Sequence, residues 1–172
     1  DCENETNSGY YFLSAKDLRN ETLVWENARQ ITKSGFEETH RRTNLMPGDI
    51  CMVNTGATIG RISIAPNDPK TSKTTFQKSV AVIKTIPSLI NNNYCFYFLK
   101  SDLKQLVNVS SGSAIHNLLL GDLRKHKISV PKSLSEQQQI VNRIEEEQAL
   151  VNSNKKLIEI FEQKIKDEIN KL

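Results

Sequence analysis

The sequence predicts an α+β protein, in which a mixed α/β domain is followed by a long C-terminal coiled-coil helix. Short β-branched and apolar runs, bounded by turns that contain Pro or Gly, occupy residues 10–130. Residues 132–172 contain no Gly or Pro, and apolar residues recur in them every seven positions. Since 172 residues suffice for one ordinary domain and an appendage, we divide the chain into residues 1–132 and 133–172.

The first expected elements are short. Tyr10–Leu13 is predicted to form a strand, and residues 22–25 form a second strand that ends on a Trp. Residues 27–42 have a mixed pattern, which predicts short helical turns with Ile31 and Phe36 as the contacts that face the core.

A buried strand and a glycine-containing loop come next. Pro47-Gly48-Asp49 is a turn signal that leads into the apolar strand Ile50–Val53. Residues 55–60 form a loop with two glycines spaced G-x-x-x-G, and residues 61–65 alternate as a half-buried strand with Ser63 outward. A phosphate-binding loop would need a further Gly-Lys-Ser/Thr, and a dinucleotide fold would need G-x-G-x-x-G. The glycines are therefore assigned to tight backbone turns.

The remainder of the first domain alternates polar and apolar segments. Residues 66–75 are expected to be a polar loop, and residues 79–86 a β-branched strand. Residues 93–109 read as a helix with an aromatic face, which favours packing in the core over stacking on bases. A last strand is expected at residues 128–130, directly after the basic segment at 124–127.

The C-terminal helix has a start signal and an apolar face. Ser135 is expected to be the N-cap, with Gln138 completing a capping box. At about 1.5 Å per residue the helix would be roughly 55 Å long, far longer than a small domain needs for itself. A helix with one apolar face along such a length needs a partner helix. The residues assigned to the contact are Ile144, Val151, Ile158, Phe161, Ile165 and Leu172.

Charge is unevenly distributed along the chain. The net charge is +3, but residues 133–172 hold six Lys or Arg against eight Asp or Glu. The preceding 132 residues hold 17 Lys or Arg against 12 Asp or Glu, a net charge of +5. A mildly basic first domain permits a polyanion as its partner.

The three cysteines, Cys2, Cys51 and Cys95, are widely separated and have no CxxC or His-rich neighbours. Neither a zinc site nor a disulfide framework is indicated, and no metal or cofactor is expected. Cys51 and Cys95 stand in apolar runs and fit small core residues in a reducing cytoplasm. No signal peptide or apolar run of membrane-spanning length is recognisable, so the sequence predicts a cytoplasmic protein.

Five fragments, in order, resemble the specificity subunit of type I restriction–modification systems. They are Pro47-Gly48-Asp49-Ile50, the loop Thr55-Gly56-Ala57-Thr58-Ile59-Gly60, the segment Ser111-Gly112-Ser113-Ala114-Ile115-His116-Asn117-Leu118, Ile128-Ser129-Val130-Pro131 and Glu136-Gln137-Gln138-Gln139-Ile140-Val141. Each is weak alone, but their order over about 100 residues and the helix that follows make the resemblance fairly specific. It covers most of the chain, from about Tyr10 to the end.

The resemblance implies a DNA target-recognition domain at 1–132 and a spacer helix at 133–172. Such a subunit is expected to be non-catalytic and to direct DNA methyltransferase subunits and a restriction/translocase subunit to a bipartite target. Family members usually carry two such domains and two helices that pair antiparallel. This chain is therefore expected either to form a homodimer through its helix or to pair with a second half of the same subunit.

The residues assigned to double-stranded DNA follow from residue type and position in the motifs. The side chains assigned to phosphates are Arg41, Lys70, Lys73, Thr74, Lys78, Arg124, Lys125 and Lys127. Those assigned to base edges are Arg61, Ser113, His116 and Asn117, since Arg suits guanine and Asn suits adenine. For the basic steps at 40–42 and 66–75, an ordinary solvated surface is the competing interpretation.

Other classes of function remain as alternatives. No catalytic residues are assigned, because the Asn/Asp-Pro-Pro-aromatic motif of amino methyltransferases and a nuclease cluster of acids with Lys are not recognised. One alternative is a coiled-coil adaptor or scaffold without direct DNA reading. Another is a recognition-domain fragment of a fused restriction–methylation enzyme.

Overall fold

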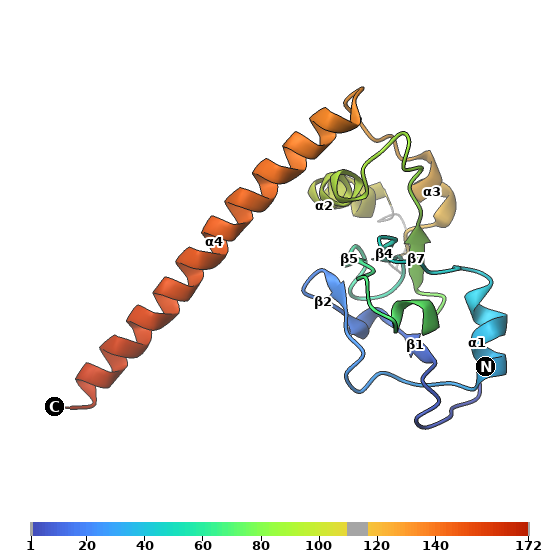
Figure 1. Ribbon diagram of the computed structural model, residues 1–172, viewed down its shortest axis with the longest axis horizontal. Coiled ribbons are helices and arrows are strands. Elements are labelled where there is room, and N and C mark those ends of the chain that lie inside the picture. The colour runs from blue at the N-terminus through green and yellow to red at the C-terminus, as the bar shows by residue number, and fades with distance from the viewer. Residues whose placement is uncertain (1, 110–116, 172) are drawn as a thin grey trace. The chain divides into compact units, whose positions relative to one another are not determined.

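The computed structural model describes residues 2–109 and 117–171 and divides into two units, Asp1–Val130 and Pro131–Leu172 (Figure 1). We call the first unit the body. Its mixture of strands and helices, together with the long helix of the second unit, confirms the predicted α+β class. The roles assigned to residues 1–132 and 133–172 stay predictions.

A three-stranded antiparallel sheet lies at the centre of the body. Its strands are β4 (Ile50–Val53) in the middle, β5 (Ile62–Ile64) on one side and β7 (Val80–Ile83) on the other. β4 matches its predicted bounds, because a four-residue apolar run between turn signals is too short for a helix and suits a buried strand. The glycines after β4 serve turns as expected, since Gly56 and Gly60 have φ angles of 103° and 85°.

The two faces of this sheet pack on different parts of the body. Successive residues of β4 point to opposite faces, so Ile50 and Met52 contact a cluster with Phe96 and Leu99 of α2 (Asn92–Val109).

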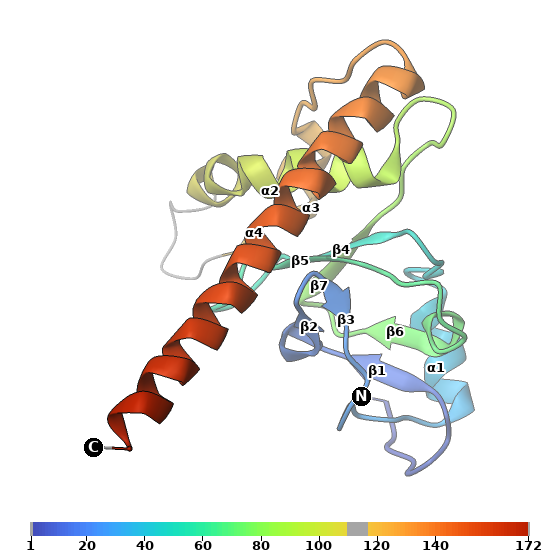
Figure 2. The ribbon, with the colours of Figure 1, turned by 60° about the vertical axis from the view of Figure 1, so that its left-hand side comes forward.

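Cys51 and Val53 point the other way, into a cluster around Leu13, Leu18 and Phe76. β1 (Tyr11–Leu13) and β6 (Thr74–Phe76), which pair in parallel, supply two of these residues (Figure 2). Both faces of the sheet are therefore covered.

The other elements of the body are short. β2 (Leu18–Arg19) and β3 (Thr22–Leu23) form an antiparallel pair. The Thr32 side chain caps α1 (Lys33–His40) by accepting a hydrogen bond from the backbone of Gly35. The remaining elements are η1 (Ala15–Asp17), η2 (Thr71–Lys73) and α3 (Leu120–Lys125).

The second unit consists mainly of one helix, α4 (Leu134–Ile169), whose 36 residues correspond to about 54 Å (Figure 1). Its N-cap is Ser133, whose hydroxyl accepts from the backbone of Glu136 at 3.1 Å, while the Glu136 carboxylate accepts from the Ser133 backbone. The predicted cap, Ser135, was wrong by two residues. The chain contains two overlapping capping boxes, and the box with a charged Glu also complements the helix dipole.

Three local expectations in the body were also wrong. Ser63 is fully buried rather than outward, because β2 and β3 as well as α2 contact its strand. Residues 128–130 form no strand, because no neighbouring strand pairs with them among the described residues. The polar segment 66–75 is not a plain loop, since η2 lies in it and β6 begins at Thr74.

Candidate nucleic-acid interface

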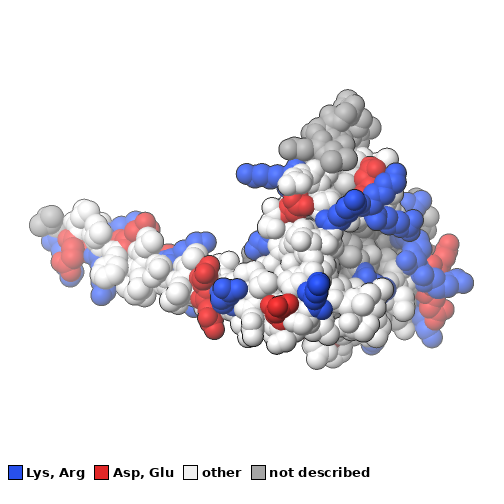
Figure 3. All heavy atoms as spheres, turned by 90° about the horizontal axis from the view of Figure 1, so that it is seen from above, with Lys and Arg blue, Asp and Glu red and all other residues white. Residues whose placement is uncertain are grey.

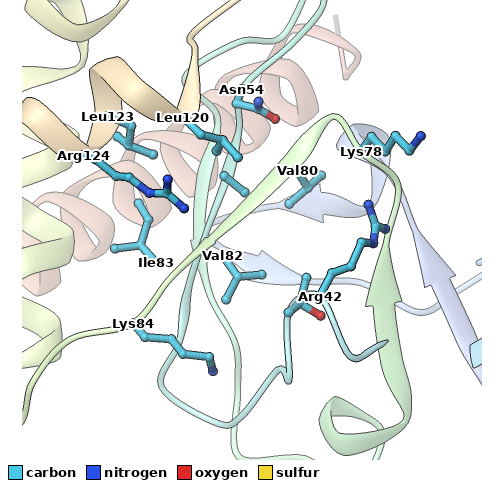
Figure 4. Close-up of a pocket in the computed structure, with 12 residues that line it drawn as sticks. Arg42, Asn54, Lys78, Val80, Val82, Ile83, Lys84, Leu120, Leu123 and Arg124 are labelled. Atoms are coloured by element: carbon cyan, nitrogen blue, oxygen red, sulfur yellow. The ribbon is translucent and has the colours of Figure 1, made fainter. Parts of the chain in front are cut away.

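A cavity of about 670 Å³ lies along β7, the strand at the edge of the central sheet (Figure 4). Val80, Val82 and Ile83 of β7 form an apolar floor, and Leu120 and Leu123 of α3 line it as well. Four cationic side chains surround this apolar surface, and among the described lining residues there is no Asp or Glu. The cations are Arg42, Lys78, Lys84 and Arg124.

Two of the four cations bind other groups of the protein, and the other two bind none of the groups that the structure describes. A guanidinium nitrogen of Arg42 donates to the carbonyl of Phe76 at 2.9 Å, and Lys84 forms an ion pair with Asp49. Neither Lys78 nor Arg124 has a hydrogen bond or ion pair to any residue that the structure describes. Both are exposed, so their charges are available to an anion from solution.

Asn54 forms part of the cavity wall just after β4. Its backbone amide donates to Ser79 at 2.9 Å, its carbonyl accepts from Leu118 at 2.8 Å, and its side chain is 8% exposed. The side-chain nitrogen donates to the Leu118 carbonyl at 3.4 Å, whereas Oδ1 is buried and has no hydrogen-bond partner in residues 2–109 and 117–171. An unsatisfied buried acceptor is uncommon and calls for an explanation.

α3 is attached to α2 next to this cavity. Nε2 of His126, the C-cap of α3, lies 2.8 Å from Oδ2 of Asp102 in α2, and both side chains are 17% exposed. The two side chains are in close contact, although Nε2 lies outside hydrogen-bond geometry. The contact, together with the nearby ring of Phe98, fixes the helix that carries Arg124.

The basic surface continues past Arg42 and Lys78. These two residues also line a neighbouring cavity of about 540 Å³, together with Arg29 and the single acid Glu38. Figure 3 shows Lys and Arg side chains gathered over part of the body surface, with Asp and Glu mixed among them only in places. Cations clustered on one surface attract a polyanion.

The structure brings together two of the residues assigned to DNA from the sequence. Lys78 and Arg124 are far apart in the chain but line the same cavity. Lys125, Lys127 and Arg41 are exposed, but none of them lines this cavity.

Lys70 and Lys73 lie at another place, around η2. Both are exposed, and the Lys70 ammonium lies 5.8 Å from the ring centre of Trp25. A cation at that distance from an indole gains from the π face. These two lysines therefore belong to a different part of the surface from Lys78.

The assignment of Thr74 to phosphate contact does not fit the structure. Thr74 is fully buried, and its hydroxyl accepts from the Trp25 indole at 2.8 Å and donates to the Lys70 carbonyl at 2.7 Å. β-branched Thr at the start of β6 serves the sheet and anchors the Trp instead.

The residues assigned to base edges have mixed outcomes. Arg61 is exposed, but its guanidinium donates to the carbonyls of Ala15 and Leu18 at 3.1 and 3.4 Å. The Asn117 side chain accepts from the Thr55 hydroxyl at 2.9 Å. Ser113 and His116 lie outside the described residues.

Sequence reasoning missed Asn54 and Lys84, and it considered Arg42 only as part of the basic step at 40–42. A signal for Lys84 was present, because Lys78, Val80, Val82 and Lys84 are two residues apart and share one side of an extended segment. No comparable local pattern marks Asn54, whose position depends on contact with residue 118, far along the chain.

The buried thiols have no nucleophilic character at neutral pH. Burial, and secondarily the charge of Asp49, raises the pKa of the Cys51 thiol far above its ordinary range. Burial raises the pKa of Cys95 to about 11. In the part of the chain that is described, no group of three or more His, Cys, Asp or Glu could hold a metal ion. No helix in that same part has the length and apolarity needed to cross a membrane.

The family described as "Type I restriction modification DNA specificity domain" matches residues 1–170. A comparison with curated protein sequences found no match.

Similar folds occur in three solved structures. One chain, from a structure on complex assembly and conformational transition of the type I R-M system, has a TM-score of 0.65 and 18% identity, and the match covers 87% of this chain and 33% of that one. The HsdS subunit from Thermoanaerobacter tengcongensis has a TM-score of 0.66 and 15% identity, and the match covers 91% of this chain and 41% of that one. The type I S subunit from M. genitalium has a TM-score of 0.53 and 17% identity, and the match covers 91% of this chain and 36% of that one. This chain thus spans between a third and about two fifths of the length of these proteins.

Proposed function

Because this chain belongs to the family of type I restriction modification DNA specificity domains, we propose that it binds double-stranded DNA sequence-specifically. It acts as the specificity subunit, or half-subunit, of a type I restriction–modification complex. The observation that carries the proposal is the family match over residues 1–170, which includes both the body and α4. The resemblance noted in the sequence motifs and the family match agree.

Charge in the body supports a DNA ligand. Lys78 and Arg124 are exposed and unpaired among the described residues, and the cavity that they line has no acidic residue in its described part. Such cations neutralise phosphates and release condensed counterions, which makes affinity fall steeply with salt. Lys70, Lys73, Lys125, Lys127 and Arg41 are proposed as further phosphate contacts, and Arg61, Asn117, Ser113 and His116 as base contacts.

The exposed apolar residues of α4 support a helical partner. Val151, Ile158, Phe161 and Ile165 are all exposed, although apolar side chains at this spacing gain by burial. We infer that the partner is either α4 of a second copy or a helix from a second half of the same subunit. Self-pairing would give a two-fold dimer with two identical recognition domains, which suits a palindromic, interrupted target.

The chain is proposed to supply recognition and no chemistry. DNA methyltransferase subunits and a restriction/translocase subunit would dock on it and act at the bound site in the cytoplasm. The raised pKa values of the Cys51 and Cys95 thiols fit this role, because neither thiol is a nucleophile at neutral pH.

A binding experiment tests this function. Fluorescence anisotropy would measure the affinity for a pool of random duplexes and for duplexes selected from that pool, over a range of salt concentrations. Parallel measurements would include the partner methyltransferase. The expected result is salt-dependent binding and a preference for the selected duplexes of at least about a thousandfold over random ones. Equal affinity for all duplexes, with and without the methyltransferase, would refute sequence-specific recognition.

A further inference from the structure

We propose that the cavity along β7 binds one nucleoside phosphate unit, with the base on the apolar floor and the phosphate against the cationic rim. This goes beyond duplex recognition, which needs only a basic surface and exposed base-reading side chains. The unit could come from a free nucleotide or from a nucleotide that leaves the stack of a DNA strand. The chemistry that the cavity recognises is the same in both cases.

The size of the cavity fits such a ligand. Its volume of about 670 Å³ lies within the range of roughly 300–1,000 Å³ that small-molecule sites occupy. The floor comes from β7 and one wall from α3, two regular elements held in place by the sheet and by the His126–Asp102 contact. The site is thus formed before a ligand arrives.

The distribution of lining chemistry points to an amphipathic anion. Val80 and Val82 also pack into the core, but the exposed apolar side chain of Leu120 on the α3 wall would have no use on a surface that only contacted duplex phosphates. A purely apolar ligand would leave Lys78 and Arg124 unpaired. A nucleotide has both parts, since its planar base is apolar on its faces and its phosphate pairs with Arg or Lys.

Asn54 supplies a third and independent feature. Asn54 is 8% exposed and lines the cavity, yet its buried Oδ1 has no hydrogen-bond partner among the described residues. A small shift of the Asn54 amide toward the cavity would let that buried oxygen accept from an exocyclic amino group of a base. Bases taken out of a helix are held in this way, by apolar contact on their faces and hydrogen bonds at their edges.

The test measures binding of ADP, dAMP, adenosine and pyrophosphate to the full chain by isothermal titration calorimetry. Wild-type protein should bind ADP and dAMP, with adenosine and pyrophosphate each at least about tenfold weaker because each has only half of the required chemistry. Equal affinity for pyrophosphate and ADP would overturn the proposal, because it would show a simple phosphate site. So would the absence of any binding of ADP and dAMP.

A pair of adjacent variants separates the cavity from the surface around it. Leu120 is 49% exposed and lines the cavity, whereas Leu119 is 56% exposed and does not line it. Asp at either position suits the start of α3, so neither change should unfold the helix. Leu120→Asp should weaken ADP binding about tenfold or more, through loss of apolar contact and through the negative charge it places beside Arg124, and Leu119→Asp should leave it unchanged. Equal effects of the two variants would overturn the proposal.

A second arm identifies the source of the nucleotide and keeps the test separate from duplex recognition. Duplexes with 2-aminopurine at successive positions would report unstacking as a rise in fluorescence. A rise with wild-type protein that Leu120→Asp abolishes would assign the cavity to a DNA nucleotide. No rise, together with ADP binding, would assign it to a free nucleotide. If the protein binds ADP but no duplex, the cavity proposal stands and the proposed function fails. If it binds selected duplexes but neither ADP nor dAMP, the proposed function stands and the cavity proposal fails.

Discussion

The apolar face of α4 gives a quantitative prediction about association. Ile158 and Ile165 are 57% and 59% exposed, and they lie seven residues apart on the same face. Full burial of an Ile side chain stabilises by about 1.5–3 kcal/mol, so their exposed parts represent roughly 1–2 kcal/mol each. The double change Ile158→Asp and Ile165→Asp alters four side chains in a two-fold pair. It should therefore cost about 4 kcal/mol or more, which weakens association about a thousandfold or more.

Sedimentation velocity over a dilution series would measure this change in the dissociation constant. The matched control is Ile160→Asp. Ile160 is 50% exposed and differs from Ile158 by two positions, about 200° around the helix, so it lies on the opposite side. The control should dimerise as wild type does, and circular dichroism should show the same helix content in both variants.

Three outcomes would refute the reasoning. A wild-type protein that stays monomeric at every concentration would exclude self-pairing. A double variant that dimerises like wild type would show that these residues are not in the contact. An equally severe effect of Ile160→Asp would show that the loss comes from added charge and not from one face of α4.

Three further predictions concern DNA affinity, the helix cap and a buried thiol. Lys78→Ala and Arg124→Ala should each make the fall of log affinity with log salt less steep, by about 0.9 in the slope. Lys33→Ala, outside the cavity, should leave the slope unchanged. Unchanged slopes in the first two variants would exclude these residues as phosphate contacts. Ser133→Ala should lower the free energy of unfolding, measured by chemical denaturation, by about 1 kcal/mol, because the helix loses its cap. Ser135→Ala, inside α4, should leave it unchanged. The opposite result would show that Ser135 is the cap, as the sequence predicts. Because burial raises the pKa of Cys95 from 9.0 to about 11, its thiol contributes stability below pH 9 that is lost as the pH rises toward 11. Cys95→Ala should flatten this part of the stability profile, and an unchanged profile would show that another group is responsible.

Local sequence patterns predicted those elements whose structure is determined by residues close together in the chain. The strand Ile50–Val53 and the helix that starts near Asn92 follow from runs and periods within a few residues. The failures occurred where a partner distant in the chain decides the structure. Ser63 reads as outward by alternation, yet it is buried, and β6 exists because β1 pairs with it. A long-range partner leaves no mark in the segment itself.

The same distinction applies to the candidate site. Residue type alone identified Lys78 and Arg124 as candidates, but their common position at one cavity depends on how β7 and α3 pack. Thr74 shows the opposite case, since a hydroxyl among lysines resembles a phosphate contact until its bonds to Trp25 and Lys70 are known. Electrostatic candidates can thus be read from a sequence, whereas their exposure and grouping come from the fold.

The charges along α4 also bear on the orientation of a self-paired helix. Residues 134–150 hold one Arg against four Glu, while residues 151–171 hold five Lys against four acids. Antiparallel pairing places the acidic part of each helix beside the more basic part of the other, whereas parallel pairing places the two acidic parts together. Exposed ion pairs contribute only about 0–1 kcal/mol each, so these charges select an orientation more than they add affinity. Asn154 stands between the apolar residues Val151 and Ile158, where a polar side chain penalises misaligned registers. Apolar burial would then supply the stability of an α4 pair, and the polar residues would supply its direction and register.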